Sequence, residues 1–301
     1  MSLYLKGLFL SASGMLVISP DGLLVKLVEE ADSFQIIFWR TLLSSLVLFL
    51  VLAATRRRRV VSHVRGMGRL GVWASVMIGI SNIAFVTAMT MTTVANTLVV
   101  LATLPLFSAL IGLAFIGERV RGRTWGAIAL SFLGVVIIMS GSLSLGGGTL
   151  SGDLVALGIP LSMGTALVLL RKAGDRDTVP VVAFGGLISA GVAFWFCDPW
   201  SVSRADMLVI MIMGLLVTPL ALSLYTSGAR YIPAAEVALL ALIETVLGPI
   251  WAWVGVGEVP APMTLVGGAL VVGAIAGNSM LALMRRRTPP ATAAPPLDGT
   301  G

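Results

Sequence analysis

Residues 93–120 read TVANTLVVLATLPLFSALIGLAFIGERV, and this stretch decides the class of fold. A helix needs roughly 20 mostly apolar residues to cross the hydrocarbon core of a bilayer, and this stretch is long enough. A barrel strand is about half as long and alternates between apolar and polar residues, which this stretch does not do. The stretch therefore predicts a membrane-crossing helix that contains a Leu104-Pro105 pair and closes on Gly117-Glu118.

Apolar runs of similar length continue in both directions from this stretch. They predict an all-α integral membrane protein with ten transmembrane helices and short connections. The prolines and small residues after the last run predict that residues 285–301 form a disordered cytoplasmic tail. The ten runs fall near 6–28, 34–54, 69–90, 94–117, 123–142, 150–171, 179–198, 206–228, 233–256 and 262–284.

The composition excludes several classes of protein. Of the 301 residues 57% are hydrophobic and only 11% are charged, whereas soluble domains carry about a quarter charged residues. A soluble enzyme, a nucleic-acid-binding domain and a disordered scaffold are therefore excluded. Cys197 is the only cysteine and His63 the only histidine, so we expect no internal disulfide, no metal site and no cofactor.

The basic residues predict how the chain is oriented. Cytoplasmic loops carry an excess of lysine and arginine, and here the basic clusters fall in every second connection. Only Lys26 and Arg204 fall on the opposite side, while Arg40 lies within a span. We therefore expect both termini on the cytoplasmic side of the plasma (inner) membrane, with the first apolar run retained as a span. The residues on the cytoplasmic side are Lys6, Arg56–Arg59, Arg65, Arg69, Arg119, Arg121, Arg123, Arg171, Lys172, Arg176, Arg230 and Arg285–Arg287.

The two halves of the chain are weakly similar. An offset of 140 places Ile116-Gly117-Glu118 on Val256-Gly257-Glu258, and each Gly-Glu pair closes the fourth span of its half. Two halves of five spans, residues 1–145 and 146–284, must lie in opposite orientations because five is odd. Such inverted repeats are typical of secondary transporters. The alternative is a gene duplication in a membrane protein that transports nothing.

At these residues the chain resembles a known family. Residues 93–120 are similar to the fourth span of EamA-type proteins of the drug/metabolite transporter superfamily. Residues 234–259, AAEVALLALIETVLGPIWAWVGVGEV, form a second copy, with Glu244 where the family often has Glu followed by proline. Here Thr245 follows Glu244 and Pro249 comes later, so we expect the helix break one turn further on. The resemblance, which spans about residues 6–284, implies a transporter but says little about its substrate.

An ionisable group deep in a membrane is costly, and it predicts a functional role. Glu244 lies about eleven residues, or roughly 16 Å, into a span that begins near Pro233, which is close to the midplane. A carboxyl group there suits the binding and release of a proton or of a substrate ammonium. The alternative is a protonated glutamate that is hydrogen-bonded between helices.

Asp21 lies in Ser19-Pro20-Asp21-Gly22, where proline and glycine predict a kink in the first span. Arg40 reaches a similar depth from the second span. Asp21 either lines a transport cavity or pairs with Arg40 to hold two helices together. The two interpretations are compatible, because an outer gate can be built from such a pair.

Further candidates are polar or aromatic residues in the spans and residues at the span ends. Asn82, Tyr225 and the Trp39 and Trp251 rings are candidate ligand contacts. For Asn82, as for Asn96, the alternative is an interhelical hydrogen bond. We expect Trp195 and Trp200 to anchor the chain at the membrane interface. The residues expected at helix ends, breaks or gates are Glu118, Glu258, Pro105 and Pro249; those expected to be solvated loop charges are Lys26, Glu29 and Glu30.

The function that these features predict is secondary active transport of a small organic metabolite by alternating access. An amino acid or amine-like substrate, export, and coupling to protons or to exchange are expected. The sequence has no nucleotide-binding motif and no catalytic constellation, so an enzyme is not expected. The expected partners are the lipid bilayer and a small molecule but no nucleic acid, for a monomer or a homodimer. The alternative is a non-transporting membrane sensor or assembly protein.

Overall fold

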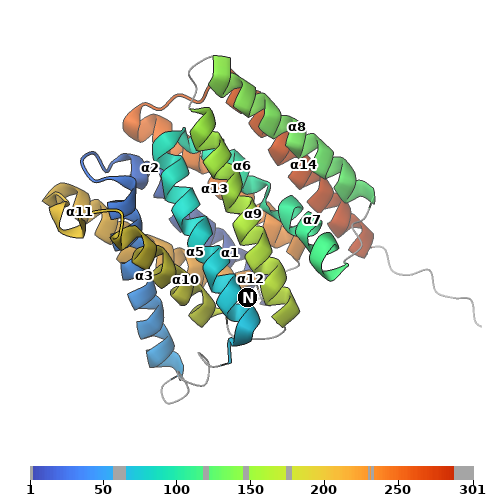
Figure 1. The fold of residues 1–301 in the computed structure, drawn as a ribbon. Coiled ribbons are helices and arrows are strands. Elements are labelled where there is room, and N and C mark those ends of the chain that lie inside the picture. Colours follow the sequence, from blue (N-terminus) through green and yellow to red (C-terminus); the bar gives the residue numbers. More distant parts are fainter. Residues whose placement is uncertain are drawn as a thin grey trace, which may run out of the picture.

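The structure is a computed structural model that describes residues 3–56, 66–117, 122–144, 149–173, 178–229, 231 and 234–287. All regular secondary structure in these ranges is helical, and the helices pack side by side into one bundle (Figure 1). The helices of the first half are α1 (Leu3–Ile18), α2 (Asp21–Lys26), α3 (Ser33–Arg56), α5 (Gly68–Met91), α6 (Val94–Ala102), α7 (Leu104–Ile116) and α8 (Gly122–Ser144). Those of the second half are α9 (Leu150–Ala173), α10 (Val179–Phe194), the 3₁₀ turn η2 (Pro199–Ser201), α11 (Arg204–Met211), the π-helical segment η3 (Ile212–Val217), α12 (Thr218–Ala229), α13 (Ala234–Val256) and α14 (Pro262–Arg287).

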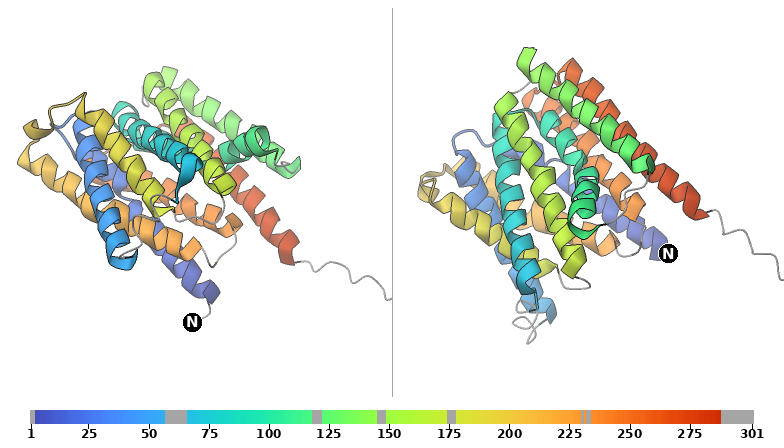
Figure 2. Two further views of the ribbon diagram at one scale, coloured as in Figure 1. Left: turned by 60° about the horizontal axis from the view of Figure 1, so that its bottom comes forward. Right: turned by 45° about the vertical axis from the view of Figure 1, so that its right-hand side comes forward.

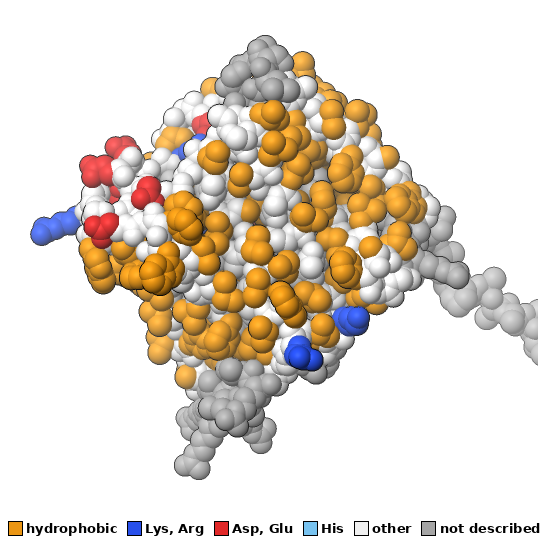
Figure 3. Space-filling view, viewed as in Figure 1, with side chains coloured by type: hydrophobic (Ala, Val, Ile, Leu, Met, Phe, Trp, Pro, Cys, Tyr) orange, Lys and Arg blue, Asp and Glu red, His pale blue; other side chains and the backbone are white. Residues whose placement is uncertain are grey.

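The helices have the length and apolarity of membrane spans. In the described ranges seven helical stretches are long and apolar enough to cross a membrane, and three shorter apolar helices accompany them at Val179–Phe194, Leu240–Val256 and Pro262–Asn278. Together they coincide with the ten predicted runs, so the predicted fold class is confirmed. Apolar side chains cover most of the face shown in Figure 3, and acidic side chains gather where α2 and α11 lie. Such an apolar surface is what lipid contact requires.

The helices pair across the two halves of the chain. Span one packs on span eight (α1 on α12) and span three on span six (α5 on α9). If each span is replaced by its equivalent in the other half, the pair of spans one and eight becomes the pair of spans six and three. The other pairs, α3 with α10, α6 with α13 and α8 with α14, each map onto themselves. Figure 2 shows α8 and α14 side by side in both views. This pattern agrees with two related halves; the predicted junction at residue 145 lies outside the described residues.

The Gly-Glu pairs have a common structural cause. Helix α7 ends at Ile116 and α13 at Val256, and the next residues, Gly117 and Gly257, have φ angles of 73° and 70°. Glycine adopts this left-handed conformation without the steric cost that a side chain brings, so it ends helices efficiently. The chain thus leaves both fourth spans at equivalent positions, as the offset of 140 predicts.

The fourth spans differ in their interiors. The first is broken into α6 and α7 at Thr103, whose hydroxyl donates to the Val100 carbonyl at 2.6 Å, just before Pro105. Helix α13 runs unbroken through Pro249, so the break predicted there is wrong. The offset of 140 places Ile243 and Thr245 where the first copy has Thr103 and Pro105. The second copy therefore lacks both the hydroxyl and the proline of that break.

The break predicted in the first span is confirmed. Helix α1 ends at Ile18 and α2 begins at Asp21, with Ser19 and Pro20 between them. The Ser19 hydroxyl donates to the Leu16 carbonyl at 2.8 Å. The break places Asp21 at the start of a separate short helix inside the bundle.

Candidate functional site

Asp21 and Arg40 form a deeply buried ion pair. Their ion pair joins Arg40 Nη2 to Asp21 Oδ2 at 2.7 Å, and the side chains are only 8% and 1% exposed, respectively. The Phe85 ring of α5 lies against the guanidinium group, 5.3 Å from its carbon. Of the two interpretations of Asp21 in the sequence, the pair with Arg40 is therefore present.

This pair does not use all of its hydrogen-bonding capacity. Asp21 Oδ1 and Arg40 Nε are buried and have no hydrogen-bond partner among the described residues. Leaving a buried polar atom unpaired costs about 1–3 kcal/mol, and more if it is charged. The ion pair thus presents one free acceptor and one free donor in the interior.

Glu244 lies near this ion pair, and Tyr225 lies near Glu244. Glu244 is partly buried on α13, which packs against α1 and α2, and it lies within electrostatic range of both Asp21 and Arg40. Tyr225 on α12 is within the same range of Glu244, and its carbonyl accepts a hydrogen bond from Ser11 of α1 at 3.3 Å. Spans one, two, eight and nine therefore converge. We call Asp21, Arg40, Glu244 and Tyr225 the interior cluster.

Trp251 lies two helical turns beyond Glu244 on α13. Its indole Nε1 donates to the Ser19 hydroxyl at 3.0 Å, at the break between α1 and α2. Close to it, a Cβ on Gly248 would approach the Leu98 side chain, so glycine permits α13 to pack tightly on α6. Trp251 therefore contacts the broken first span, although not through a charged group.

Two other predicted residues lie apart from the interior cluster. Trp39 donates from Nε1 to the Pro199 carbonyl at 2.8 Å, and its ring meets the Trp200 ring edge-on at 5.8 Å. Asn82 donates to the Ser189 hydroxyl at 3.4 Å, between α5 and α10. Both make contacts that hold helices or loops together, as the sequence interpretation expects for Asn82 but not for Trp39.

A second charged cluster lies where α2 and α13 end and α6 begins. We call this the outer end, because the basic residues predict that it faces outside. Glu258 Oε2 pairs with Lys26 Nζ at 3.3 Å, and Glu258 Oε1 accepts the Val94 N–H at 2.6 Å. Lys26 also donates to the Thr92 carbonyl at 2.8 Å. The prediction of a solvated Lys26 is thus wrong, while Glu258 makes a helix-end contact; Glu118 lies outside the described residues.

A polar network lies next to this cluster, in which Asn96 makes the expected interhelical hydrogen bonds and Asp153 plays a part that the sequence interpretation missed. Asp153 at the start of α9 is fully buried and accepts hydrogen bonds from Thr92 Oγ1 at 2.7 Å and from Asn96 Nδ2 at 3.0 Å. The Asn96 amide oxygen accepts from Thr264 of α14 at 2.6 Å. The sequence signal that could have identified this network is Asp153 itself, an aspartate near the start of the apolar run at 150–171. The network ties spans four, six and ten together at the outer end.

Asp206 was also missed. Its carboxylate accepts the backbone N–H groups of Glu29, Glu30 and Ala31 at 2.8–3.2 Å and so fixes the loop between α2 and α3. The Glu29 and Glu30 side chains are exposed, as predicted. Ser203 accepts the Asp206 N–H at 3.2 Å, so this Ser-x-x-Asp sequence is a helix start that could have been recognised.

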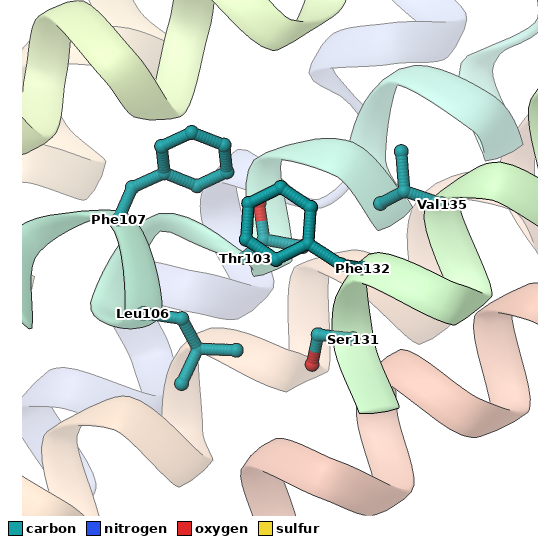
Figure 4. Close-up of a pocket in the computed structure, with 6 residues that line it drawn as sticks. All are labelled: Thr103, Leu106, Phe107, Ser131, Phe132 and Val135. Atoms are coloured by element: carbon teal, nitrogen blue, oxygen red, sulfur yellow. The ribbon is translucent and has the colours of Figure 1, made fainter. Parts of the chain in front are cut away.

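The pocket shown in Figure 4 contains none of the predicted binding residues. It has a volume of about 170 Å³, space open to its surroundings included, and lies between the break in the fourth span and α8. The pocket is almost entirely apolar. No group of three or more His, Cys, Asp or Glu in the described residues could hold a metal. The lining residues are Thr103, Leu106, Phe107, Ser131, Phe132 and Val135.

Comparison with known proteins identifies the family. The model of the EamA-like transporter family matches residues 5–140 and again residues 150–280. The chain belongs to the EamA-like transporter family. The two matches fall on the two five-helix halves, which makes the chain a multi-pass membrane protein of a transporter family and not of an enzyme family.

Two individual proteins are similar to this EamA-like chain. An uncharacterized transporter, YdfC of Bacillus subtilis (strain 168), is 28% identical over 181 residues, and the match spans 58% of each chain. A solved structure titled "Crystal structure of protein" has a TM-score of 0.66 at 18% identity, over 95% of this chain and 99% of that one. At this identity the structural likeness concerns the fold alone.

Proposed function

We propose that this chain moves a small organic metabolite with an amino group across the inner membrane by alternating access, and that it exports this substrate. The observation that carries the proposal is the interior cluster: a buried ion pair with a free acceptor and a free donor, at a helix break, beside the carboxyl of Glu244. Broken helices with charged groups near the midplane form the substrate sites of secondary transporters. In this proposal the two halves, residues 1–145 and 146–284, move against each other so that the site opens to one side of the membrane and then to the other. Both termini stay on the cytoplasmic side.

Glu244 is the residue that we assign to energy coupling. Its position along span nine leads us to expect it near the midplane, and it lies within electrostatic range of another carboxylate, Asp21. A carboxyl group in such a place can hold a proton in one state of the cycle and a substrate ammonium in another. Competition of proton and substrate for one group is sufficient to couple their movements in opposite directions.

The contact of Lys26 with Glu258 is the outer gate in this proposal. It joins the end of span one to the end of span nine and also holds the N-terminus of α6. Closing these three helix ends together blocks the route from the outer end to Asp21. Pro105 lies at the break of the fourth span, where we place a hinge; Pro249 has no break beside it.

The test is a metabolite screen on proteoliposomes under an imposed pH gradient, with wild-type protein, Glu244→Gln and Glu29→Gln. Glu29 is an exposed carboxylate, so its substitution controls for loss of one charge. We expect gradient-dependent flux of at least one compound in the wild type and in Glu29→Gln, and background flux in Glu244→Gln. Persisting flux in Glu244→Gln would show that Glu244 is structural. If no compound moves in any sample, the sensor or assembly interpretation replaces transport.

A further inference from the structure

The formal charges of the interior cluster do not cancel. Asp21 and Arg40 neutralise each other at 2.7 Å, and the ionised carboxylate of Glu244 leaves one negative charge in excess. Tyr225 is neutral in its ordinary form. Lys26, the next cation along α2, is held by Glu258 and the Thr92 carbonyl at the outer end. A charge in a low-dielectric interior is very costly unless it is paired or neutralised.

We infer that the substrate carries a single net positive charge and exchanges with one proton on Glu244, so that a transport cycle moves no net charge. The inference rests on the proposed transport function and specifies the substrate class of that same site. The empty site is neutral when Glu244 holds a proton. The loaded site is neutral when a monocation has replaced that proton. The displaced proton leaves to the side of the membrane from which the substrate entered.

The charge balance at Arg40 argues against a substrate carboxylate. Asp21 already pairs with the guanidinium at 2.7 Å, and the Phe85 ring lies against it. A substrate carboxylate at Arg40 would therefore add a second negative charge to one that is already compensated. We place an incoming ammonium group between Asp21 Oδ1, a buried acceptor without a partner, and the Glu244 carboxylate, which lies within electrostatic range of Asp21. A zwitterionic amino acid would leave the excess negative charge uncompensated.

The experiment adds matched pairs of compounds to the proteoliposome screen. Phenylethylamine and phenylalanine share a side chain, as do 3-methylbutylamine and leucine, and each pair differs only by the carboxylate. Rates are taken above those of protein-free liposomes, because free amines also cross lipid unaided. We expect the protein to move an amine at least tenfold faster than the matched amino acid, and Glu29→Gln to behave as the wild type does.

The second arm measures the voltage dependence of accumulation for any compound that moves. A carrier that moved one net charge per cycle would change the accumulation ratio about 50-fold per 100 mV. We expect less than a twofold change when a potassium gradient with valinomycin imposes 100 mV at zero pH gradient. A faster zwitterion, or a voltage-driven accumulation, would overturn this inference while transport itself stood. Failure of every compound would remove both the transport function and this inference.

Discussion

Two ion pairs lie five residues apart on α2, and they differ in depth and in what they join. Asp21 is almost fully buried and pairs with Arg40 of α3, so that this pair joins spans one and two of the same half. Lys26 is 23% exposed and Glu258 17%, and their pair joins the two halves at the outer end. The same chemistry therefore occurs once deep within one half and once between the halves near the surface.

This difference assigns the two pairs different roles. Breaking a buried pair by removing one partner costs about 3–5 kcal/mol, because a charge is left without compensation. A partly exposed pair contributes only about 0–1 kcal/mol, because water and ions replace the lost partner. The inner pair therefore stays closed and forms part of the site. The outer pair can open and close within a transport cycle.

The largest effect is expected from breaking the inner pair. Arg40→Met leaves the Asp21 carboxylate buried and uncompensated, and we expect a loss of about 3–5 kcal/mol of stability. Adding Asp21→Asn should restore most of this stability, because no charge then remains unpaired. Transport should stay absent in the double variant. Thermal unfolding of the purified proteins and flux in proteoliposomes check the two parts, and a single variant as stable as the wild type would show that the pair does not hold spans one and two.

A smaller effect is expected at the outer pair. Lys26→Glu places two acidic side chains together and should cost about 1 kcal/mol. Combining it with Glu258→Lys should restore the ion pair but not the contact with Val94, because a lysine cannot accept an N–H. We therefore expect partial recovery in thermal unfolding. Asp32→Asn is the control, since the Asp32 carboxylate accepts only the local N–H groups of Phe34 and Gln35. Full recovery by the swap would mean that the contact with α6 contributes nothing.

Much of the fold follows from the sequence because the lipid bilayer requires each span to be an apolar helix of sufficient length. Apolar length sets the ten helices, and left-handed glycines set the ends of the fourth spans at Gly117 and Gly257. Pro20 correctly marks the break in the first span. Pro249 misled the prediction, because α13 continues through it and a membrane helix tolerates a proline where its neighbours satisfy the freed backbone groups. The first copy breaks at Thr103, just before Pro105.

The candidate site was only partly predictable. Depth along a span follows from counting residues, which is why Asp21 and Arg40 were expected at a similar depth and Glu244 near the midplane. Which neighbours a side chain meets depends on how the spans pack and on the rotation of each helix about its own axis. That rotation cannot be derived from the sequence of one chain. The sequence therefore did not predict that Trp39 contacts Pro199. It also did not predict that Lys26 pairs with Glu258, a residue 232 positions away along the chain.

Alternating access requires that the outer pair opens while the inner pair stays closed behind it. Ser19 is 1% exposed and lies at the break of the first span, two residues before Asp21, so Ser19→Cys in a Cys197→Ser background reports access to this break from outside. The measurement is the rate at which a membrane-impermeant maleimide labels this cysteine from the outer side. We expect Glu258→Gln to raise that rate about two- to fivefold, since about 0.4–1 kcal/mol of the closed state is lost. Asp32→Asn should leave it unchanged. An unchanged rate in Glu258→Gln would contradict the account, because the outer pair would then not be a gate.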